Sequence, residues 1–279
     1  MVRSDLDQRR DQEADKLTPE QEADVAAALL AFWTSQDEAA RAQQARGVND
    51  VGGRAGVTSG GHLDRVAQLL GRICIGAGAP KEEVFYKYPV DDPNKRAGAS
   101  IGYTLPGYYR PTKQWDLVVY RDNVPIVAIE LKSQKGPSYS NNANNRAEEA
   151  LGNALDFRRA QQAGLIPGDP WIGYVFVIQD DEKSRRGRGN QDRGRFPKDR
   201  MFEGWSYVER VRRLCQRLVE DEHYDRTWAV ATSAPPNFSW DEPDAELSGY
   251  VQFLTGLTAA IGRHYDGVPR TGQAKLSLF

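Results

Sequence analysis

Two short apolar runs near the middle of the chain are typical of a β-hairpin. Residues 115–120 and 126–132 are rich in β-branched side chains, and a turn signal, Asp122-Asn123, separates them. A turn that closes there makes the two runs antiparallel neighbours in a sheet. The pattern therefore predicts a hairpin with a mostly apolar body.

Three ionisable side chains lie at the ends of these predicted strands. Asp116 stands near the start of the first run, and Glu130 and Lys132 end the second. In the antiparallel register Asp116 falls opposite Glu130, within one residue, and Glu130 and Lys132 share a face because side chains alternate along a strand. Charged side chains are rarely buried unless they are paired or bind a metal ion. The pattern predicts two carboxylates and a lysine at one point of a sheet.

Such a cluster suits metal-assisted phosphodiester hydrolysis. Mg²⁺ takes oxygen ligands and is commonly held by one or two carboxylates, here Asp116 and Glu130, and the carbonyl of Leu131 would add a ligand. A divalent ion lowers the pKa of a bound water and stabilises charge on a phosphoryl oxygen. Lys132 would orient that water or stabilise the phosphate in the transition state. The alternative is a hairpin whose charged ends are simply solvated.

Periodicity along the rest of the chain predicts an α/β protein. Residues 84–113, rich in Tyr, Pro, Gly and basic side chains, are expected to form a long loop or short strands. The run at 171–178 is continuously apolar, which is typical of a central strand covered on both faces. The sum is a mixed central β-sheet flanked by helices. Helices are expected at 18–46, 62–76, 146–163, 207–221 and 246–263, and strands at 171–178 and 227–232.

Composition divides the chain into two parts. Residues 1–60 are predicted to form an N-terminal extension, with disorder over 1–16, a helix, and a glycine-rich linker that runs from 47 to 61. The helix is expected either to dimerise or to pack on the core. Residues 61–279 are expected to form the main domain. Asp64, at the start of its first helix, is either an accessory acid or an ordinary first-turn residue.

Polar residues fill the segment between the hairpin and the next predicted helix. Residues 133–145 contain the breaker Gly136-Pro137 and four asparagines, and Asn145 is a plausible N-cap for a helix that opens at Arg146. Asparagines before a helix suit phosphate binding or contacts to adenine edges. A solvated capping loop explains the same composition, so both interpretations are kept.

The motifs of this region resemble those of the XhoI-type restriction endonuclease family, within the PD-(D/E)XK nuclease superfamily. The Asp…Glu-x-Lys core is shared by many nucleases, whereas the longer string is specific. The shared segments are Leu-Pro-Gly-Tyr-Tyr-Arg-Pro-Thr-Lys at 105–113, Gln-Trp-Asp at 114–116, Glu-Leu-Lys-Ser-Gln at 130–134, Gly-Pro-Ser at 136–138, and Asn-Asn-Ala-Asn-Asn-Arg-Ala-Glu-Glu-Ala-Leu-Gly at 141–152.

The resemblance implies a type II restriction endonuclease with a restriction-endonuclease-like fold, residues 61–279 being the nuclease domain. By position it assigns Asp116, Glu130 and Lys132 to the catalytic centre, and the Mg²⁺ ligands are then Asp116, Glu130 and Leu131. It implies hydrolysis of double-stranded DNA at the palindrome CTCGAG, leaving 5′ TCGA overhangs, without an organic cofactor. A two-fold target is matched by a two-fold protein, so a homodimer is expected.

Candidate DNA contacts follow from charge, position and the family motifs. Glu148, for example, is able to accept a hydrogen bond from cytosine N4. Two other functions remain as alternatives: a repair or recombination nuclease that recognises DNA structure, and a catalytically silent DNA-binding protein on the same fold. The candidate contacts are Arg110, Lys113, Ser138, Asn141, Asn142, Asn144, Asn145, Arg146, Glu148, Arg185, Arg186 and Arg188.

The distribution of charge along the chain is more informative about nucleic-acid binding than the net charge is. The chain carries a formal net charge of −2, which by itself counts against nucleic-acid binding. Residues 182–200, however, hold eight bases and three acids, a local charge of +5. This arginine-rich stretch suits phosphate contacts or an arm that enters a groove, and a solvated loop is the alternative.

Other features narrow the class of protein. With no run of 18 apolar residues and a charged N-terminus, neither a membrane span nor a signal peptide is expected. Cys74 lies in an apolar helical stretch, so a buried thiol and a reducing cytoplasm are predicted. The three histidines are scattered along the chain and form no ligand cluster, which argues against a zinc site.

Overall fold

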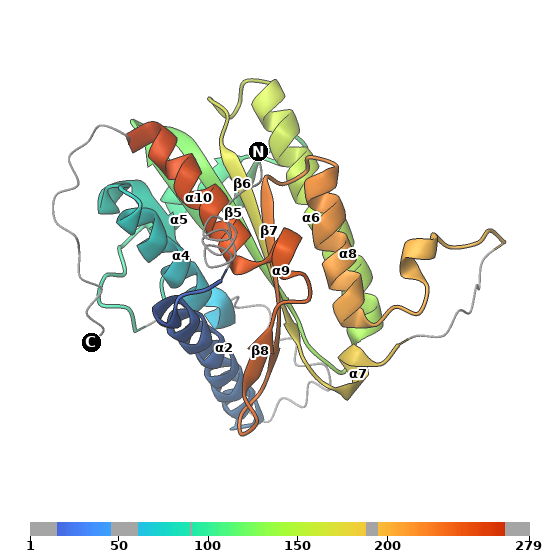
Figure 1. Cartoon of the computed structure of the whole chain (residues 1–279). Helices are drawn as coiled ribbons and strands as arrows, with labels where there is room; N and C mark the ends of the chain where they lie inside the picture. The colour runs from blue at the N-terminus through green and yellow to red at the C-terminus, as the bar shows by residue number, and fades with distance from the viewer. Residues whose placement is uncertain (1–15, 46–60, 90, 188–194, 266–279) are drawn as a thin grey trace, which may run out of the picture.

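The computed structural model describes residues 16–45, 61–89, 91–187 and 195–265, with only the backbone over 36–45. A six-stranded sheet with the order β1-β4-β5-β6-β7-β8 lies at its centre (Figure 1). β5, β6 and β7 are parallel, and the other pairings are antiparallel, so the expected mixed sheet is confirmed. The strands are β1 (Val84–Tyr86), β4 (Leu117–Arg121), β5 (Val124–Gln134), β6 (Trp171–Gln179), β7 (Arg226–Ser233) and β8 (Ser239–Asp241).

Helices cover both faces of the sheet. α2 (Pro19–Ala45), α4 (Asp64–Gly76) and α10 (Tyr250–Tyr265) pack on one face, and α6 (Tyr139–Gln162) and α8 (Tyr207–Glu220) pack on the other (Figure 1). The two layers enclose two separate hydrophobic cores, one on each side of the sheet. This three-layer arrangement is the α/β architecture that the periodicity predicts.

Alternation along the strands divides their side chains between the two cores. Val175 and Val177 of β6 lie in the α2/α4/α10 core, while Tyr174 and Phe176 lie in the α6/α8 core. All four side chains are almost completely buried. The predicted central strand, covered on both faces, is therefore confirmed, because parallel strands with helices on both sides have no solvent-facing side.

The hairpin forms in the predicted register. Asp122 (φ 50°) and Asn123 (φ 65°) both take the left-handed conformation that a tight two-residue hairpin turn requires, which Asp and Asn tolerate better than most residues. Leu117 pairs with Ile129, and the backbone N–H of Asp116 donates to the carbonyl of Ile129 at 3.0 Å. Asp116 therefore lies opposite Glu130.

The N-terminal helix α2 is part of the core. Its side chains Leu29 and Phe32 are completely buried with those of α4, and Nε1 of Trp33 donates to Oγ1 of Thr232 on β7 at 3.3 Å. The helix was expected either to dimerise or to pack on the core, and its described part packs on the core. Nearly all of the segment expected to be disordered (1–16) and of the expected linker (47–61) lies outside the described residues.

Two expectations about element bounds are wrong. Residues 133–145 are not one polar loop, because β5 continues to Gln134 and α6 begins at Tyr139, so Asn145 lies inside the helix and is not its N-cap. Burial of Tyr139 and Ala143, one helical turn apart, anchors this first turn against α8 and overrides the weak helix propensity of asparagine. The expected last helix is also divided in two, because Gly249 is extended (φ −89°, ψ 164°) between α9 and α10. A Cβ at Gly249 would lie 2.3 Å from the carbonyl oxygen of Ala245, so this position requires glycine.

Short elements fill the remaining described regions. Residues 84–113 were expected to form a long loop or short strands, and they contain short strands. Of these, β2 and β3 pair into a small second sheet. No helix in the described part of the chain is long and apolar enough to cross a membrane. The short elements are η1 (Gly61–Leu63), η2 (Lys81–Glu83), α5 (Ala99–Gly102), β2 (Thr104–Pro106), β3 (Thr112–Gln114), α7 (Glu182–Arg185), η3 (Arg200–Phe202) and α9 (Ala245–Ser248).

Candidate active site

Asp116 is buried at the start of β4 and both of its carboxylate oxygens are occupied. Oδ1 accepts a hydrogen bond from Nζ of Lys87 at 2.6 Å, and Oδ2 accepts one from the backbone N–H of Leu131 at 2.7 Å. Burial and the nearby charge of Glu130 raise the pKa of Asp116, and Lys87 opposes that rise. The carboxylate is thus held rigidly at the point where the two hairpin strands meet.

Glu130 faces Asp116 from β5 and is only 1% exposed. Its carboxylate is paired with Nζ of Lys113 at 2.7 Å and with Nζ of Lys132, and Nδ2 of Asn153 donates to it at 3.3 Å. Burial raises its pKa, but Lys113 and Lys132 outweigh that effect and lower the pKa overall. Glu130 is therefore a buried anion with three donors around it.

Lys132 lies on the same face of β5 as Glu130, as the alternation predicts. Its ammonium group pairs with Glu130 and lies 3.9 Å from a carboxylate oxygen of Glu149 on α6. Burial lowers the pKa of Lys132, whereas Glu130 and Asp116 raise it, and the net direction is upward. The hairpin therefore brings Asp116, Glu130 and Lys132 together.

The donor set of this cluster fits a divalent ion with a preference for oxygen. Asp116 and Glu130 present carboxylate oxygens, and the raised pKa of Asp116 reflects in part the repulsion between the two groups that a cation would relieve. The carbonyl of Leu131 belongs to the same stretch of β5. Among the described residues no group of three His, Cys, Asp or Glu side chains gathers at one point. Two carboxylates are the usual number for Mg²⁺, which keeps several waters.

Asp64 lies near this cluster, in the first turn of α4. Burial raises its pKa to about 7, and the negative charge of Asp116 adds to the effect. Together with Lys87, Lys95 and Tyr103 it lines a polar cavity of about 400 Å³ beside the carboxylates. This position is consistent with an accessory acid, one of the two interpretations drawn from the sequence.

The polar residues of the α6 segment differ in what they contact. Arg146 donates from Nε to the carbonyl of Ser133 at 3.2 Å and pairs with Glu149, so it is tied to the end of β5. Asn144 accepts from Arg210 of α8. Asn142 is half-buried, and the remaining predicted contacts of this segment are exposed: Ser138, Asn141, Asn145 and Glu148.

The two basic residues predicted upstream reach the cluster from the β2–β3 hairpin. Lys113 of β3 pairs with Glu130, and its ammonium group also lies over the Trp115 ring at 4.9 Å. Arg110 donates to Asp156 at 2.8 Å and to Asn153 at 2.7 Å, both on α6. Lys113 thus belongs to the cluster around the two carboxylates, and Arg110 reaches Glu130 through one intervening side chain, Asn153.

The described part of the arginine-rich stretch is held by ion pairs. Arg185 of α7 pairs with Asp180 and Asp241, and Arg186 pairs with Glu182. Arg188 lies outside the described residues. The two pairs of Arg185 hold α7 against the ends of β6 and β8, whereas the pair of Arg186 is local to α7, and both arginine side chains remain partly exposed.

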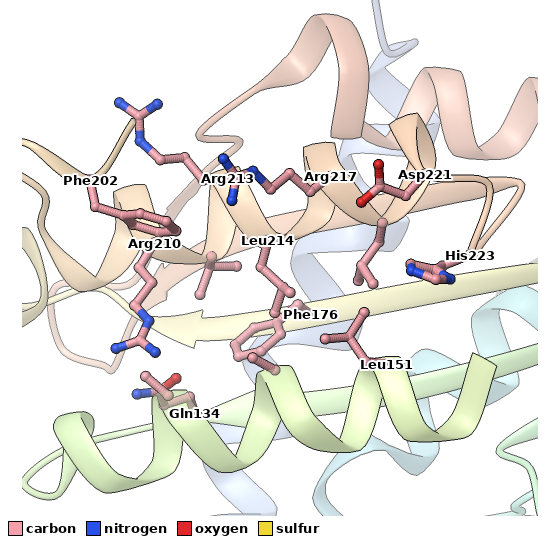
Figure 2. Close-up of a pocket in the computed structure, with 14 residues that line it drawn as sticks. Gln134, Leu151, Phe176, Phe202, Arg210, Arg213, Leu214, Arg217, Asp221 and His223 are labelled. Atoms are coloured by element: carbon pink, nitrogen blue, oxygen red, sulfur yellow. The ribbon is translucent and has the colours of Figure 1, made fainter. Parts of the chain in front are cut away.

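A second cavity lies between α6 and α8, away from the paired carboxylates. It has a volume of about 280 Å³ and a mostly apolar wall that includes Leu151 and Phe176. Figure 2 shows Arg210, Arg213 and Arg217 of α8 among the side chains that line it. None of the three predicted catalytic side chains lines this cavity.

Three side chains that hold the cluster or the neighbouring hairpin in place were not predicted from the sequence. Lys87, Asn153 and Asp156 hold Asp116, Glu130 and the β2–β3 hairpin. Each lies between 23 and 46 positions along the chain from its partner, in the contacts Lys87–Asp116, Asn153–Glu130 and Asp156–Arg110. One signal was available: Asn153 and Asp156 are polar residues on the otherwise apolar side of α6 and are both buried. Buried polar side chains need partners, which marks such positions as structural or functional.

A mixed sheet flanked by helices, with two buried carboxylates and a lysine on one hairpin, defines a restriction-endonuclease-like fold. The sequence agrees, because residues 42–238 match the family described as restriction endonuclease XhoI. The chain therefore belongs to the XhoI restriction endonuclease family. Members of this family are type II restriction enzymes, that is, site-specific deoxyribonucleases.

Individual relatives support this assignment. The chain is 38% identical over 191 residues to the type II restriction enzyme XhoI of Xanthomonas vasicola, a match that spans 67% of this chain and 71% of the relative. It is 34% identical over 225 residues to the type II restriction enzyme BstVI of Geobacillus stearothermophilus, spanning 77% and 94% of the two chains. The type II restriction enzyme AbrI of Azospirillum brasilense is 34% identical over 164 residues, a match that spans 58% of this chain and 68% of the relative. No solved structure gave a significant match.

Proposed function

We propose that this enzyme is a Mg²⁺-dependent homodimer that cuts duplex DNA at CTCGAG and leaves 5′ TCGA overhangs. The observation that carries the proposal is the convergence of Asp116, Glu130 and Lys132 on one hairpin, with both carboxylates buried and held by donors. The target sequence comes from the family resemblance. A palindrome has two equivalent scissile bonds, which a two-fold dimer matches with one active site for each strand.

On this proposal, each residue of the cluster has a separate role in hydrolysis. Asp116, Glu130 and the carbonyl of Leu131 would hold the ion, which lowers the pKa of a bound water and stabilises charge on the phosphoryl oxygen. Lys132, which pairs with Glu130, would orient the attacking water and balance the charge that develops on the phosphate. Lys87 and Lys113 keep the two carboxylates in place, since each pairs with one of them.

DNA contacts are proposed for the exposed side chains around this cluster. On this proposal the polar first half of α6, with Asn141, Asn145 and Glu148, contacts the bases or the backbone near the scissile phosphate. Side-chain amides and carboxylates of this kind pair with adenine and cytosine edges. Arg185, Arg186 and Arg188 are proposed to contact phosphates farther along the duplex, where arginine suits bidentate binding.

The experiment is digestion of plasmid DNA with one CTCGAG site, in Mg²⁺ and in EDTA, with the fragment ends sequenced. The expected result is one Mg²⁺-dependent cut per site, with TCGA overhangs. Cutting at junctions or nicks without sequence preference would favour a repair nuclease. Specific binding of the site without cutting in Mg²⁺ would favour a silent DNA-binding protein, and either outcome would overturn the proposal.

A further inference from the structure

The loop that joins β2 to β3 exposes two adjacent tyrosines. Tyr108 is 52% exposed and Tyr109 is 65% exposed, and their rings meet edge to face with centroids 4.9 Å apart. Two neighbouring aromatic side chains that remain this exposed form a compact apolar surface with two hydroxyl groups. Tyrosine is suited to recognition because it offers a large contact area and loses little conformational entropy on binding.

A buried carboxylate holds this loop. Oδ1 of Asp156, on α6, accepts from the backbone N–H groups of Tyr108 at 2.9 Å and of Tyr109 at 2.7 Å, and Oδ2 accepts from Nε of Arg110 at 2.8 Å. A Cβ on Gly107 would lie 2.7 Å from Oδ2 of Asp156, so only glycine allows this close approach. A buried carboxylate that fixes a surface loop indicates that the loop has to keep one position for its function.

The same contacts connect the loop to the catalytic carboxylate. Arg110 donates from Nη2 to Oδ1 of Asn153 at 2.7 Å, and Nδ2 of Asn153 donates to Glu130 at 3.3 Å. From the other side, Lys113 at the base of the same hairpin pairs with Glu130 at 2.7 Å. The tyrosines therefore lie two side chains, Arg110 and Asn153, away from Glu130.

We propose that Tyr108 and Tyr109 contact the DNA next to the scissile phosphate, and that Asp156 is the positioning residue that holds them there. The inference rests on the proposed function, because it takes duplex DNA as the molecule that covers Glu130. The rings pack against sugar or base, and the hydroxyl groups donate to phosphate oxygens. Arg110 links the DNA-contacting loop to the catalytic centre.

The charges around the loop favour DNA over a second protein surface. Arg110 directly follows the tyrosines in the loop and Lys113 lies at the base of the same hairpin, and cationic side chains close to aromatic rings suit a phosphate backbone. A second copy of this chain seated on the tyrosines is the competing occupant, and the test below separates the two.

The first test compares three proteins on a short duplex with one CTCGAG site: wild type, the double variant Tyr108→Ala/Tyr109→Ala, and the control Leu247→Ala. Leu247 is also an exposed apolar side chain, but on α9. Fluorescence anisotropy in Ca²⁺ measures the dissociation constant, and cleavage in Mg²⁺ gives KM and kcat. We expect the double variant to weaken binding and raise KM at least about tenfold, from the loss of two aromatic contacts, with the control unchanged.

The second test asks whether Asp156 acts through the loop. Asp156→Asn keeps the shape of the side chain and removes its charge, so it should also weaken DNA binding. In the triple variant, Asp156→Asn should cost clearly less binding free energy than it does alone, because the two tyrosines it positions are already absent and only its contact with Arg110 is left to lose. Additive losses would mean that Asp156 acts independently of the tyrosines and would overturn its assigned role.

The outcomes separate this inference from the proposed function. A wild-type protein that neither cuts nor binds the duplex overturns both. A wild type that cuts, together with a double tyrosine variant that binds DNA as tightly and keeps its KM, overturns the inference alone. Sedimentation of the same samples gives the oligomeric state. A double variant that is a monomer where the wild type is a dimer would assign the tyrosines to a protein interface. That result would likewise overturn the inference.

Discussion

The backbone N–H of Leu131 donates a hydrogen bond of 2.7 Å to Oδ2 of Asp116. This contact joins the strand that carries Glu130 to the carboxylate on the neighbouring strand, at the point where the two acids face each other. The position of Asp116 therefore depends on the backbone register of the hairpin as well as on Lys87. A one-residue slip would turn Glu130 and Lys132 to the other face of the sheet.

Asp116→Asn is expected to lower the cleavage rate by roughly a thousandfold, the effect of losing about 4 kcal/mol of transition-state stabilisation. The neutral amide keeps the size of the side chain but is a poor ligand for a divalent ion. The initial rate on a CTCGAG plasmid measures the effect. Asp122→Asn in the turn of the same hairpin is the matched control, because Asp122 is 82% exposed and Asn also tolerates its positive φ. Equal rates for the two variants would contradict the assignment of Asp116.

Lys87→Met is expected to destabilise the fold by about 1–2 kcal/mol, because it leaves the buried carboxylate of Asp116 without its ion-pair partner. The side chain of Lys87 is 32% exposed, so solvent moderates the loss. Urea denaturation gives the free energy of unfolding. Lys81→Met, which removes an exposed lysine that contacts Asn94, is the control and should change that free energy by less than about 0.5 kcal/mol.

Phe32→Ala in α2 is expected to destabilise the protein by about 3–5 kcal/mol, since the ring is completely buried against the core of the sheet. Leu30→Ala, two positions earlier and 41% exposed, should cost far less. Thermal unfolding of both variants measures the difference. Similar melting temperatures for the two would mean that α2 does not contribute to the stability of the nuclease fold.

His62 is expected to make the free energy of unfolding depend on pH. Burial, with the positive charges of Lys135, Arg146 and Lys87, lowers its pKa to about 4, from the ordinary value of 6.5. The unfolded chain thus binds a proton more readily, so the stabilising contribution is complete above pH 6.5 and is lost as the pH falls from 6.5 toward 4. A shift of this size corresponds to about 3 kcal/mol.

The test for His62 compares the wild type with His62→Gln, whose amide is able to reach the hydroxyl of Ser133 that Nε2 of His62 contacts at 2.8 Å. The free energy of unfolding is measured at several values between pH 4.5 and 7.5. The wild type should lose stability relative to the variant as the pH falls, because glutamine does not titrate. A constant difference across that range would exclude His62 as the source.

Local patterns were sufficient for the elements whose periodicity is complete within a short segment. The hairpin, its turn at Asp122-Asn123 and the opposition of Asp116 and Glu130 follow from alternation and turn chemistry, which act between neighbours in sequence. The doubly covered β6 follows from its unbroken apolar run. The start of α6 did not follow, because its first turn forms by packing Tyr139 on Tyr207, with ring centroids 5.0 Å apart.

By itself, the amino-acid sequence determined the four longer strands of the sheet, β4 to β7, the three residues predicted to be catalytic, and the family; it did not predict the short edge strand β8. Only the tertiary structure decided which side chains hold them: Lys87 on Asp116, Asn153 on Glu130, and Asp156 on the tyrosine loop. The physical reason is that a strand or turn is specified by short-range sterics and periodicity. A contact between distant segments depends instead on how whole layers pack, and no local pattern encodes that.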